Sequence, residues 1–181
     1  MLIGVISDTH GVLPRAATDA LTRHDLDLIV HAGDVGVFAI LEQLEQIAPV
    51  IAVRGNCDFR LSLLKLPSLA EKVCGNTLLV ITHRPESLEV ELRRPRYGKM
   101  LSGRGESSTD ASAQSAQIVG IHGHTHLPYF KARESANMQD VYLLCPGSPV
   151  EPRGGSKASV AILTLGAAGT DVLPSAEFIE V

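Results

Sequence analysis

Apolar residues in the first half of the chain form short continuous runs, with amphipathic segments between them. Continuous runs without polar alternation are typical of strands buried on both faces of a parallel sheet. These runs are LIGVIS (2–7), LDLIVHA (26–32), VIAVR (50–54) and NTLLVITH (76–83). Apolar residues at helical spacing predict helices over LPRAATDALTRH (13–24), FAILEQLEQIA (38–48) and, despite Pro67, LSLLKLPSLAEK (61–72). The first half is therefore predicted to alternate strands and helices.

The second half is predicted to be rich in short, largely antiparallel strands. Periodicity fails from 86 to 117, so we interpret that stretch as a long surface excursion. Within it, DASAQSAQ (110–117) predicts a short helix capped by Ser108 or Thr109. Turn residues then separate the predicted strands IVGIH (118–122), PYFKAR (128–133), DVYLLCPGS (140–148), SVAILTL (159–165), TDVLP (170–174) and EFIEV (177–181). Because sheet faces and helical stripes need apolar partners, helices should flank a β sandwich.

Composition narrows the class of protein. With 181 residues, 45% of them apolar, the chain is predicted to form one domain over residues 1–181. A net charge of −4 argues against a general nucleic-acid-binding surface. Cys57, Cys74 and Cys145 form no CxxC pair, which favours a reducing compartment. The amino terminus lacks a basic signal region and no apolar run could span a bilayer, so we expect a cytoplasmic protein that does not enter a membrane.

Polar residues follow the predicted strands of the α/β part. Ligands of such folds collect at the carboxyl ends of strands. The polar groups at these ends are Asp8-Thr9-His10, Gly33-Asp34, Gly55-Asn56-Cys57-Asp58, His83 and Gly123-His124-Thr125-His126. Side chains at alternate positions of a strand share a face, so His124 and His126 should converge. Asp, Asn and His without a thiolate pair suit manganese, iron or zinc, and predict a catalytic metal site.

The five polar groups also match a known pattern in its order: D-x-H, G-D, G-N-[HC]-D, a strand-end His, and G-H-x-H. With SDTHG, HAGD, VRGNCD, GHTHLP and PGSPVEPRGG, the chain resembles the calcineurin-like metallophosphoesterases. The resemblance is strongest to their small single-domain YfcE-type phosphodiesterase branch, whose eukaryotic relative is the retromer scaffold subunit. It covers residues 1 to about 155.

The resemblance implies an α/β fold, a four-layer α-β-β-α sandwich of two mixed β-sheets flanked by helices, and a dinuclear metal site. Asp8, His10 and His126 would bind one ion. Asn56, His83 and His124 would bind the other, and Asp34 would bridge both. Mn²⁺ is favoured, with Ni²⁺, Zn²⁺, Fe and Mg²⁺ as alternatives. Two such ions lower the pKa of a shared water, so the implied chemistry is phosphoester hydrolysis by a metal-bridging hydroxide.

Other residues extend or depart from the family pattern. Asn56 could also hydrogen-bond the phosphate, and His31 and Asp58 could support ligand histidines. The branch usually continues T-H-G-H, whereas this chain has Thr82-His83-Arg84-Pro85.

Residues 84–104 hold six basic and three acidic residues, and we interpret them either as a basic lid in which Arg84 binds substrate or as a solvated loop. Cys57 replaces a histidine that protonates the leaving group, and would act as a different acid or fill space. His122 is expected to be structural or to support a ligand.

Three functions follow from these expectations. The leading one is a metal-dependent phosphodiesterase or phosphatase acting on small phosphoesters. The alternative is a protein-interaction scaffold of the same fold with weak or no catalysis. A nuclease is less favoured because the chain is acidic overall. The branch further suggests a homo-oligomer, either a dimer or a tetramer.

Overall fold

The computed structural model describes residues 1–60, 62–97, 117–133, 141–167, 170 and 172–181. In this part of the chain, two mixed five-stranded sheets have the orders β10-β9-β1-β2-β3 and β4-β5-β6-β8-β7. The first sheet is built from β1 (Leu2–Ile6), β2 (Leu28–His31), β3 (Val50–Ala52), β9 (Ser159–Thr164) and β10 (Ser175–Glu180). The second is built from β4 (Leu69–Cys74), β5 (Thr77–Thr82), β6 (Gln117–Ile121), β7 (Tyr129–Ala132) and β8 (Val141–Cys145). The helices are α1 (Arg15–Thr22), α2 (Ala39–Glu45) and α3 (Pro85–Leu92).

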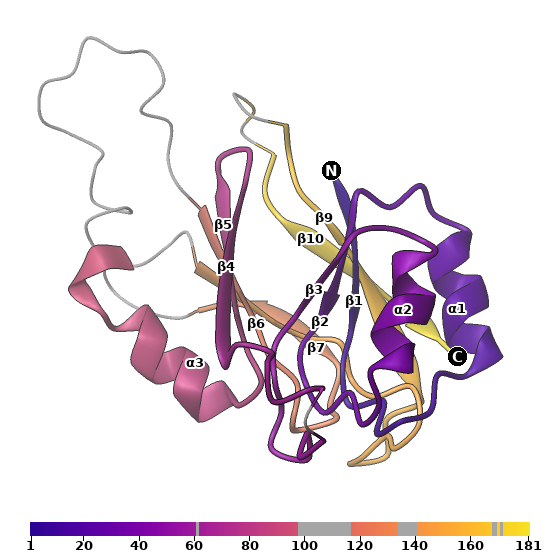
Figure 1. The fold of residues 1–181 in the computed structure, drawn as a ribbon. Coiled ribbons are helices and arrows are strands. Elements are labelled where there is room, and N and C mark those ends of the chain that lie inside the picture. The colour runs from indigo at the N-terminus through magenta and orange to yellow at the C-terminus, as the bar shows by residue number, and fades with distance from the viewer. Residues whose placement is uncertain (61, 98–116, 134–140, 168–169, 171) are drawn as a thin grey trace, which may run out of the picture.

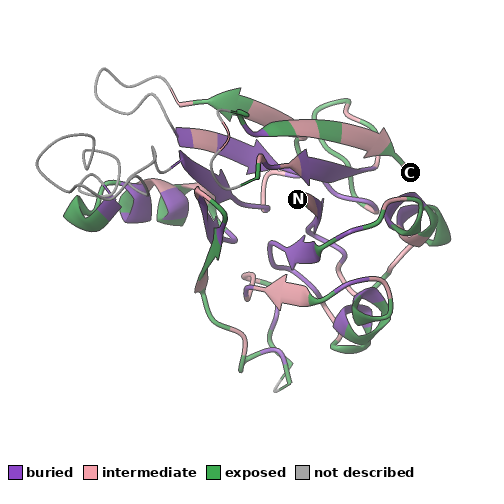
Figure 2. Cartoon of the chain, turned by 90° about the horizontal axis from the view of Figure 1, so that it is seen from above, coloured by how far each residue is buried: buried purple, intermediate pink, exposed green. Residues whose placement is uncertain are grey.

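Alternation along the buried strands produces four layers. In β1, Ile3 and Val5 face the second sheet, where they pack in one core with Leu79 and Ile81 of β5. Ile6 and Ile29 of the first sheet instead belong to the core under α1 and α2. Leu78 and Val80 of β5 point the other way, toward α3. Helices thus cover the two outer faces of the paired sheets, and the predicted α-β-β-α sandwich is confirmed (Figure 1). Each helix has one buried and one exposed side (Figure 2).

The strand register brings several carboxyl ends to one side of the molecule. Ile6 pairs with His31, and His31 pairs with Ala52, so β1, β2 and β3 end together. In the second sheet, Ile81 of β5 pairs with Ile121 of β6. The loops that follow these five strands meet at the bottom of Figure 1, far from the amino terminus. This shared edge is where the polar groups of the sequence are delivered.

Three predicted elements are wrong. The segment 61–72 was predicted to be helical, but its last residues continue into β4 (69–74), a half-exposed edge strand. The excursion predicted from 86 contains α3, which starts with Pro85 at its first position, where proline is favoured, and buries Leu88 and Leu92. The described part of TDVLP (170–174) is not a strand. The predicted helix over 110–117 has only its final residue, Gln117, within the described residues, and that residue begins β6.

The second half is also less antiparallel than predicted. β6 pairs in parallel with β5 on one side and with β8 on the other. β4, β7, β9 and β10 make antiparallel pairs. Parallel neighbours need long connections, which a local pattern of short strands does not reveal. Within the described residues, none of the helices is long and apolar enough to cross a membrane.

Candidate metal centre

The structure brings the seven predicted metal ligands to one place. Ligand atoms lie within 4.8 Å of one another in three sets: Asp8, His10 and His126; Asp8, Asp34 and His83; and His10, Asp34 and Cys57. The other two predicted ligands flank these sets. Asn56 Oδ1 is 3.1 Å from His83 Nε2, and the His124 ring centroid is 5.3 Å from that of His83. Both sheets contribute, so the centre lies where their loops meet.

The backbone at this centre is held in an unusual conformation. Among the described non-glycine residues, positive φ angles occur at Asp8, His10, Asp34, His124 and His126, all of them predicted ligands. Left-handed backbone costs energy in residues that carry a Cβ, and it persists only where neighbouring structure enforces it. Here the two loops enforce it on each other: Asp8 N–H donates to Gly33 O and His10 N–H to Asp34 O, each at 2.9 Å.

Two glycines permit the close approach of the ligands. A Cβ on Gly55 would lie 2.1 Å from Asp34 Oδ1, and one on Gly123 would lie 2.6 Å from Asp8 Oδ2. Either distance is far shorter than a van der Waals contact. The glycines of the G-N and G-H motifs are therefore needed for space, since each lets its loop lie directly on a carboxylate of another loop, from the same sheet for Gly55 and from the other sheet for Gly123.

Backbone carbonyls fix which nitrogen of two ligand histidines faces the centre. Ala32 O lies 2.8 Å from His83 Nδ1, and Glu151 O lies 2.6 Å from His126 Nδ1. A carbonyl only accepts, so each Nδ1 carries the proton and each neutral ring presents the lone pair of Nε2 to the centre. That nitrogen is 3.3 Å from Asp34 Oδ2 in His83 and 3.2 Å from Asp8 Oδ1 in His126.

In this arrangement the lone pair of each histidine Nε2 faces a carboxylate oxygen, so two hydrogen-bond acceptors face each other. Without a metal, each histidine needs a second proton; with one, a cation between nitrogen and oxygen satisfies both. His10 adds a buried Nε2 that has no hydrogen-bond partner in the described structure. Oxygen and imidazole donors of this kind fit a hard or borderline divalent ion, so the residues present fit the predicted metals.

The two carboxylates differ in their electrostatics. Burial raises the pKa of Asp8 above its ordinary value, although Ser7 Oγ and the cationic forms of His83 and His126 oppose the shift. Burial also acts to raise the pKa of Asp34, but His83 and the Cys57 N–H, which donates to Oδ1 at 2.7 Å, outweigh it and lower the pKa. In turn, burial lowers the pKa of His83 and the Asp34 carboxylate raises it by more. Of the two carboxylates, Asp34 therefore stays ionised to the lower pH.

His31 and Asp58 do not support ligand histidines in the way expected. His31 donates from Nε2 to Thr9 Oγ1 at 3.0 Å, since that hydroxyl already donates to Val35 O. Asp58 accepts from the N–H groups of Gly36 and Gly55, each at 2.8 Å, and so ties two ligand loops together. Carbonyl groups of Ala32 and Glu151 orient the histidines instead, and backbone groups have no signal in the sequence.

Sequence reasoning also missed two supporting serines. Ser7 Oγ donates to Asp8 Oδ2 at 2.5 Å, and Ser148 Oγ donates to the Asp8 carbonyl at 2.8 Å. Both residues are buried. The S-D and P-G-S blocks carried the signal for them, but each is also an ordinary turn sequence. His122 is structural: its Nδ1–H donates to Gly123 O at 2.8 Å, and Nε2 accepts from the Tyr129 hydroxyl.

Cys57 and Arg84 both lie at the exposed side of the centre. Cys57 does not fill space in the core, because its side chain is exposed and its sulfur lies near His10 and Asp34. Partial burial and the Asp34 carboxylate raise the pKa of the thiol, so it stays protonated at neutral pH. Arg84 precedes α3, and its charge lies close enough to His124 to contribute, after burial and His83, to lowering the pKa of that imidazole.

Beyond Arg84, the arginines of the predicted basic lid that the structure describes are paired with carboxylates and do not form a free basic surface. Arg96 contacts Glu91 at 2.5 Å and Glu71 at 2.9 Å, and Arg94 contacts Glu91 at 3.0 Å. Arg93 lies 3.8 Å from Glu89. These guanidinium groups are neutralised by carboxylates on or near α3. Lys99 and Arg104 lie outside the described residues.

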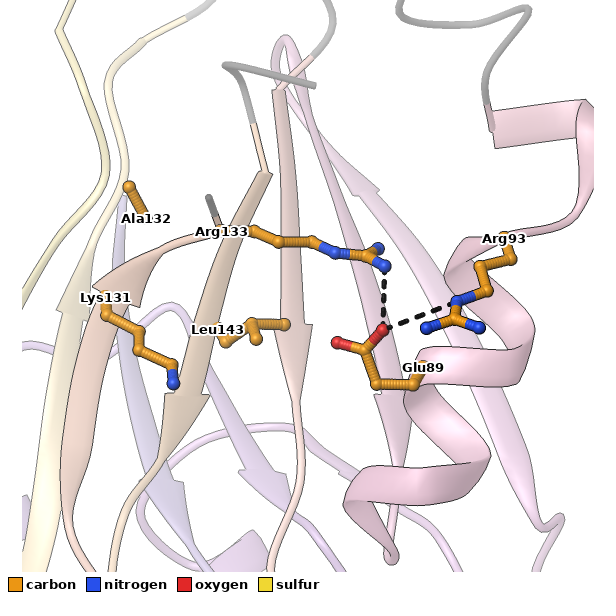
Figure 3. A pocket seen from close by; sticks show the side chains of 6 residues that line it. All are labelled: Glu89, Arg93, Lys131, Ala132, Arg133 and Leu143. Atoms are coloured by element: carbon orange, nitrogen blue, oxygen red, sulfur yellow. Dashed lines mark hydrogen bonds and ion pairs between the residues drawn. The ribbon is translucent and has the colours of Figure 1, made fainter. Parts of the chain in front are cut away.

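A pocket of about 520 Å³ lies between α3 and strands β7 and β8, lined by Glu89, Arg93, Lys131, Ala132, Arg133 and Leu143 (Figure 3). Arg133 and Glu89 form an ion pair of 2.7 Å across one side of it. None of its lining residues is a predicted metal ligand, and charges of both signs meet there. We therefore assign the chemistry to the ligand cluster and not to this hollow.

Comparison with known proteins agrees with the geometry. The family model for the calcineurin-like phosphoesterase superfamily domain matches residues 1–168. A probable metallophosphoesterase of Methanothermobacter thermautotrophicus is 34% identical over 166 residues, covering 84% of this chain and 80% of that protein. Phosphodiesterase YfcE of Escherichia coli K12 is 27% identical over 178 residues, covering 87% of this chain and 84% of that protein.

Solved structures repeat the fold. The E. coli YfcE structure superposes with a TM-score of 0.61 at 26% identity, covering 91% of this chain and 88% of that one. Vps29 from Entamoeba histolytica, in a complex with Zn²⁺, superposes with a TM-score of 0.66, covering 99% of this chain and 98% of that one. Its identity is 19%, so this likeness concerns the fold alone.

Proposed function

The chain belongs to the calcineurin-like phosphoesterase superfamily, and from this premise we propose that it is a metal-dependent phosphodiesterase that hydrolyses small phosphoesters at the candidate metal centre. The observation that carries the proposal is the orientation of His83 and His126. Each has its Nδ1 committed to a carbonyl and its Nε2 turned toward a carboxylate at 3.2–3.3 Å. Buried acceptors that face each other need a cation, and two such pairs share one cluster.

We propose Asp8, His10 and His126 as ligands of one ion, Asn56, His83 and His124 as ligands of the other, and Asp34 as the bridge. Divalent ions bound there would polarise the phosphoryl group and make water nucleophilic near neutral pH. Mn²⁺ is our first choice, because oxygen and imidazole donors without thiolate suit it. The low pKa of Asp34 keeps that carboxylate ionised for binding.

Three side chains are proposed to act on the ester itself. Asn56 is half-exposed, and its amide could donate to a phosphate oxygen. Arg84, on the His124 side, supplies a positive charge toward the phosphate. Cys57 holds a proton on an exposed sulfur beside His10 and Asp34, and we assign it to protonation of the leaving group. Its raised pKa keeps the proton on the sulfur at neutral pH and opposes a role as nucleophile.

A scaffold without catalysis is the second candidate, favoured by the likeness in fold to Vps29. Five predicted ligands in strained backbone conformations support the enzyme instead. Such strain is typical of functional sites and has no value to a surface used only for docking.

The proposal is tested with purified protein stripped of metal. Mn²⁺, Mg²⁺, Ni²⁺ or Zn²⁺ is added, and hydrolysis of bis-p-nitrophenyl phosphate and p-nitrophenyl phosphate is followed. We expect metal-dependent turnover, faster with the diester, that Asp34→Asn abolishes. The matched control is Asp19→Asn, which removes an exposed carboxylate on α1 and should leave turnover unchanged. Binding of metals without turnover of either ester would favour the scaffold.

A further inference from the structure

Exposed apolar side chains follow the candidate ligands along four different loops. Val12 comes two residues after His10, Phe38 four after Asp34, Phe59 three after Asn56 and Leu127 directly after His126. Their exposed fractions are 55% for Val12, 41% for Phe38, 79% for Phe59 and 42% for Leu127. We call these four side chains the apolar rim.

Phe59 is held on the first-sheet side of the centre. Its N–H donates to Cys57 O at 3.1 Å, and the Cys57 N–H donates to Asp34 Oδ1 at 2.7 Å. Asp58 fastens the same loop to Gly36 and Gly55. The backbone of Phe59 is therefore fixed to a ligand loop, while its ring remains almost entirely in solvent and belongs to none of the described core clusters.

Leu127 occupies the second-sheet side. It follows the β6 loop, and its Cδ2 lies 2.7 Å from the position that a Cβ on Gly154 would take. The loop of Gly154 also contains Glu151, whose carbonyl holds His126. The loops after β3 and β6 approach from different sheets and meet at the same end of the molecule (Figure 1). Phe59 and Leu127 are thus carried by ligand loops that come from the two different sheets.

Single exposed apolar residues are ordinary, but their recurrence after four ligand positions is not explained by packing. The candidate ligands themselves are polar and fit metal ions and phosphate. A phosphodiester carries two organic groups, of which one leaves. The other must lie beyond the metal ligands, against the side chains next to them. Among the exposed side chains that the ligand loops carry, four are apolar and two of these are phenyl rings.

We infer that the apolar rim selects phosphodiesters whose non-leaving group is aromatic, an aryl or nucleobase ring, with Phe59 and Leu127 as the residues that determine this specificity. The inference rests on the proposed function of the same site. Contact with such a ring would remove apolar surface of Phe59 and Leu127 from water, which favours aromatic over small alkyl groups.

The test compares bis-p-nitrophenyl phosphate with methyl p-nitrophenyl phosphate, which share a leaving group and differ in the group that remains. Phe59→Ala and Leu127→Ala should each lower the ratio of kcat/KM for the aryl over the methyl ester roughly 10-fold. The loss should fall mainly on KM for the aryl ester, with the methyl ester changed less than about 2-fold. Val73→Ala is the matched control. Val73 is 65% exposed on the edge strand β4, and it pairs with Leu78, at the end of β5 opposite to His83.

A binding arm separates this inference from the proposed function. Phenylphosphonate should bind the metal-loaded protein roughly 10-fold more tightly than methylphosphonate by calorimetry, and Phe59→Ala should remove most of that difference. Turnover with an unchanged ester ratio in both variants would overturn the role of the rim and leave the hydrolase standing. A preference for phenylphosphonate without turnover would support the rim and overturn the hydrolase. Equal phosphonate affinities would overturn the rim whether or not the protein turns over esters.

Discussion

The structure holds two dense clusters of ionisable side chains that are built in opposite ways. Around α3, guanidinium groups and carboxylates match: Arg96 contacts Glu71 and Glu91, and Arg94 contacts Glu91. In the metal centre, carboxylates face histidine nitrogens whose other nitrogen is already committed to a carbonyl. The first cluster neutralises itself, and the second lacks positive charge. An uncompensated set of acceptors, and not the density of charge, therefore marks the functional site.

The backbone separates the clusters in the same way. The α3 cluster is carried by α3, the residues that follow it and β4, and none of its described residues has a positive φ angle. The metal centre is carried by loops with positive φ at five ligands. Long, flexible side chains find partners without strain, whereas short Asp and His side chains converge only if the backbone is forced toward a common point.

The largest expected effect comes from filling space at the centre. Gly55→Ala would place a Cβ 2.1 Å from Asp34 Oδ1 and displace that carboxylate. We expect kcat/KM for bis-p-nitrophenyl phosphate to fall roughly 100-fold, the loss that a displacement of about 1 Å causes in a catalytic group. Gly155→Ala is the control for backbone strain alone, since its φ is +79° but no atom lies within 4 Å of its Cβ position. Wild-type activity in Gly55→Ala would show that Asp34 need not lie where it does.

The second prediction concerns the cation that the carboxylates and histidines of the metal centre need. A divalent ion at 100 times its dissociation constant should raise the free energy of unfolding by about 2.7 kcal/mol, because it binds the folded state alone. Urea denaturation with and without Mn²⁺ measures this gain. Asp8→Asn should lose most of it, and Glu91→Gln in the α3 cluster should keep all of it. Equal gains in both variants would place the ion outside the centre.

A buried histidine beside the centre gives the third prediction. Burial lowers the pKa of His31 to about 4, against 6.5 in the unfolded chain. Between these values the unfolded state binds a proton that the folded state does not. The stabilisation is complete above pH 6.5 and is lost as pH falls toward 4, by about 1.4 kcal/mol per pH unit.

His31→Gln, which keeps a donor toward Thr9, should flatten that slope in metal-free protein. The free energy of unfolding is measured at intervals between pH 6.5 and pH 4 for both proteins. An unchanged slope in the variant would assign the acid sensitivity to the carboxylates of the centre.

The smallest effect is expected in the self-neutralised cluster. Glu91→Gln weakens contacts with Arg94 and Arg96, but both guanidinium groups are well exposed and Arg96 retains Glu71. Solvent screens both guanidinium groups, so we expect a smaller loss of unfolding free energy than the loss of the metal-dependent gain in Asp8→Asn. Turnover should stay within about 2-fold of wild type. A large loss of activity would mean that the two clusters are coupled.

Much of the fold follows from local pattern, and its failures have identifiable causes. Continuous apolar runs correctly located β1, β2, β3 and β5, because buried strands leave no other pattern. The pattern wrongly predicted helix over LAEK (69–72), because β4 is a half-exposed edge strand with little apolar signal. The sequence did not predict α3 because Leu88 and Leu92 are its only buried apolar residues, while the apolar Val90 is exposed and Glu91 is buried.

The side chains that make up the candidate site could be predicted from the sequence. Strand-end positions located Asp8, Asp34 and His83, since parallel strands share a carboxyl edge. What orients these side chains was not predictable. The carbonyls of Ala32 and Glu151, and the positive φ angles, depend on the path of the backbone. Pairing of Arg96 with Glu71 was equally hidden, because those residues lie far apart in the sequence and meet through the packing of α3 near β4.

Calorimetric titration of the metal-stripped protein with Mn²⁺ would show directly whether the ligand cluster binds metal, because it counts ions independently of substrate. We expect two ions per chain in the wild type and in Glu91→Gln. Asp34→Asn, which lacks the proposed bridge, should bind fewer ions or bind them more than about 100-fold more weakly, a larger loss than supporting groups cause. Absence of binding in the wild type, or unchanged binding in Asp34→Asn, would contradict the proposed metal centre.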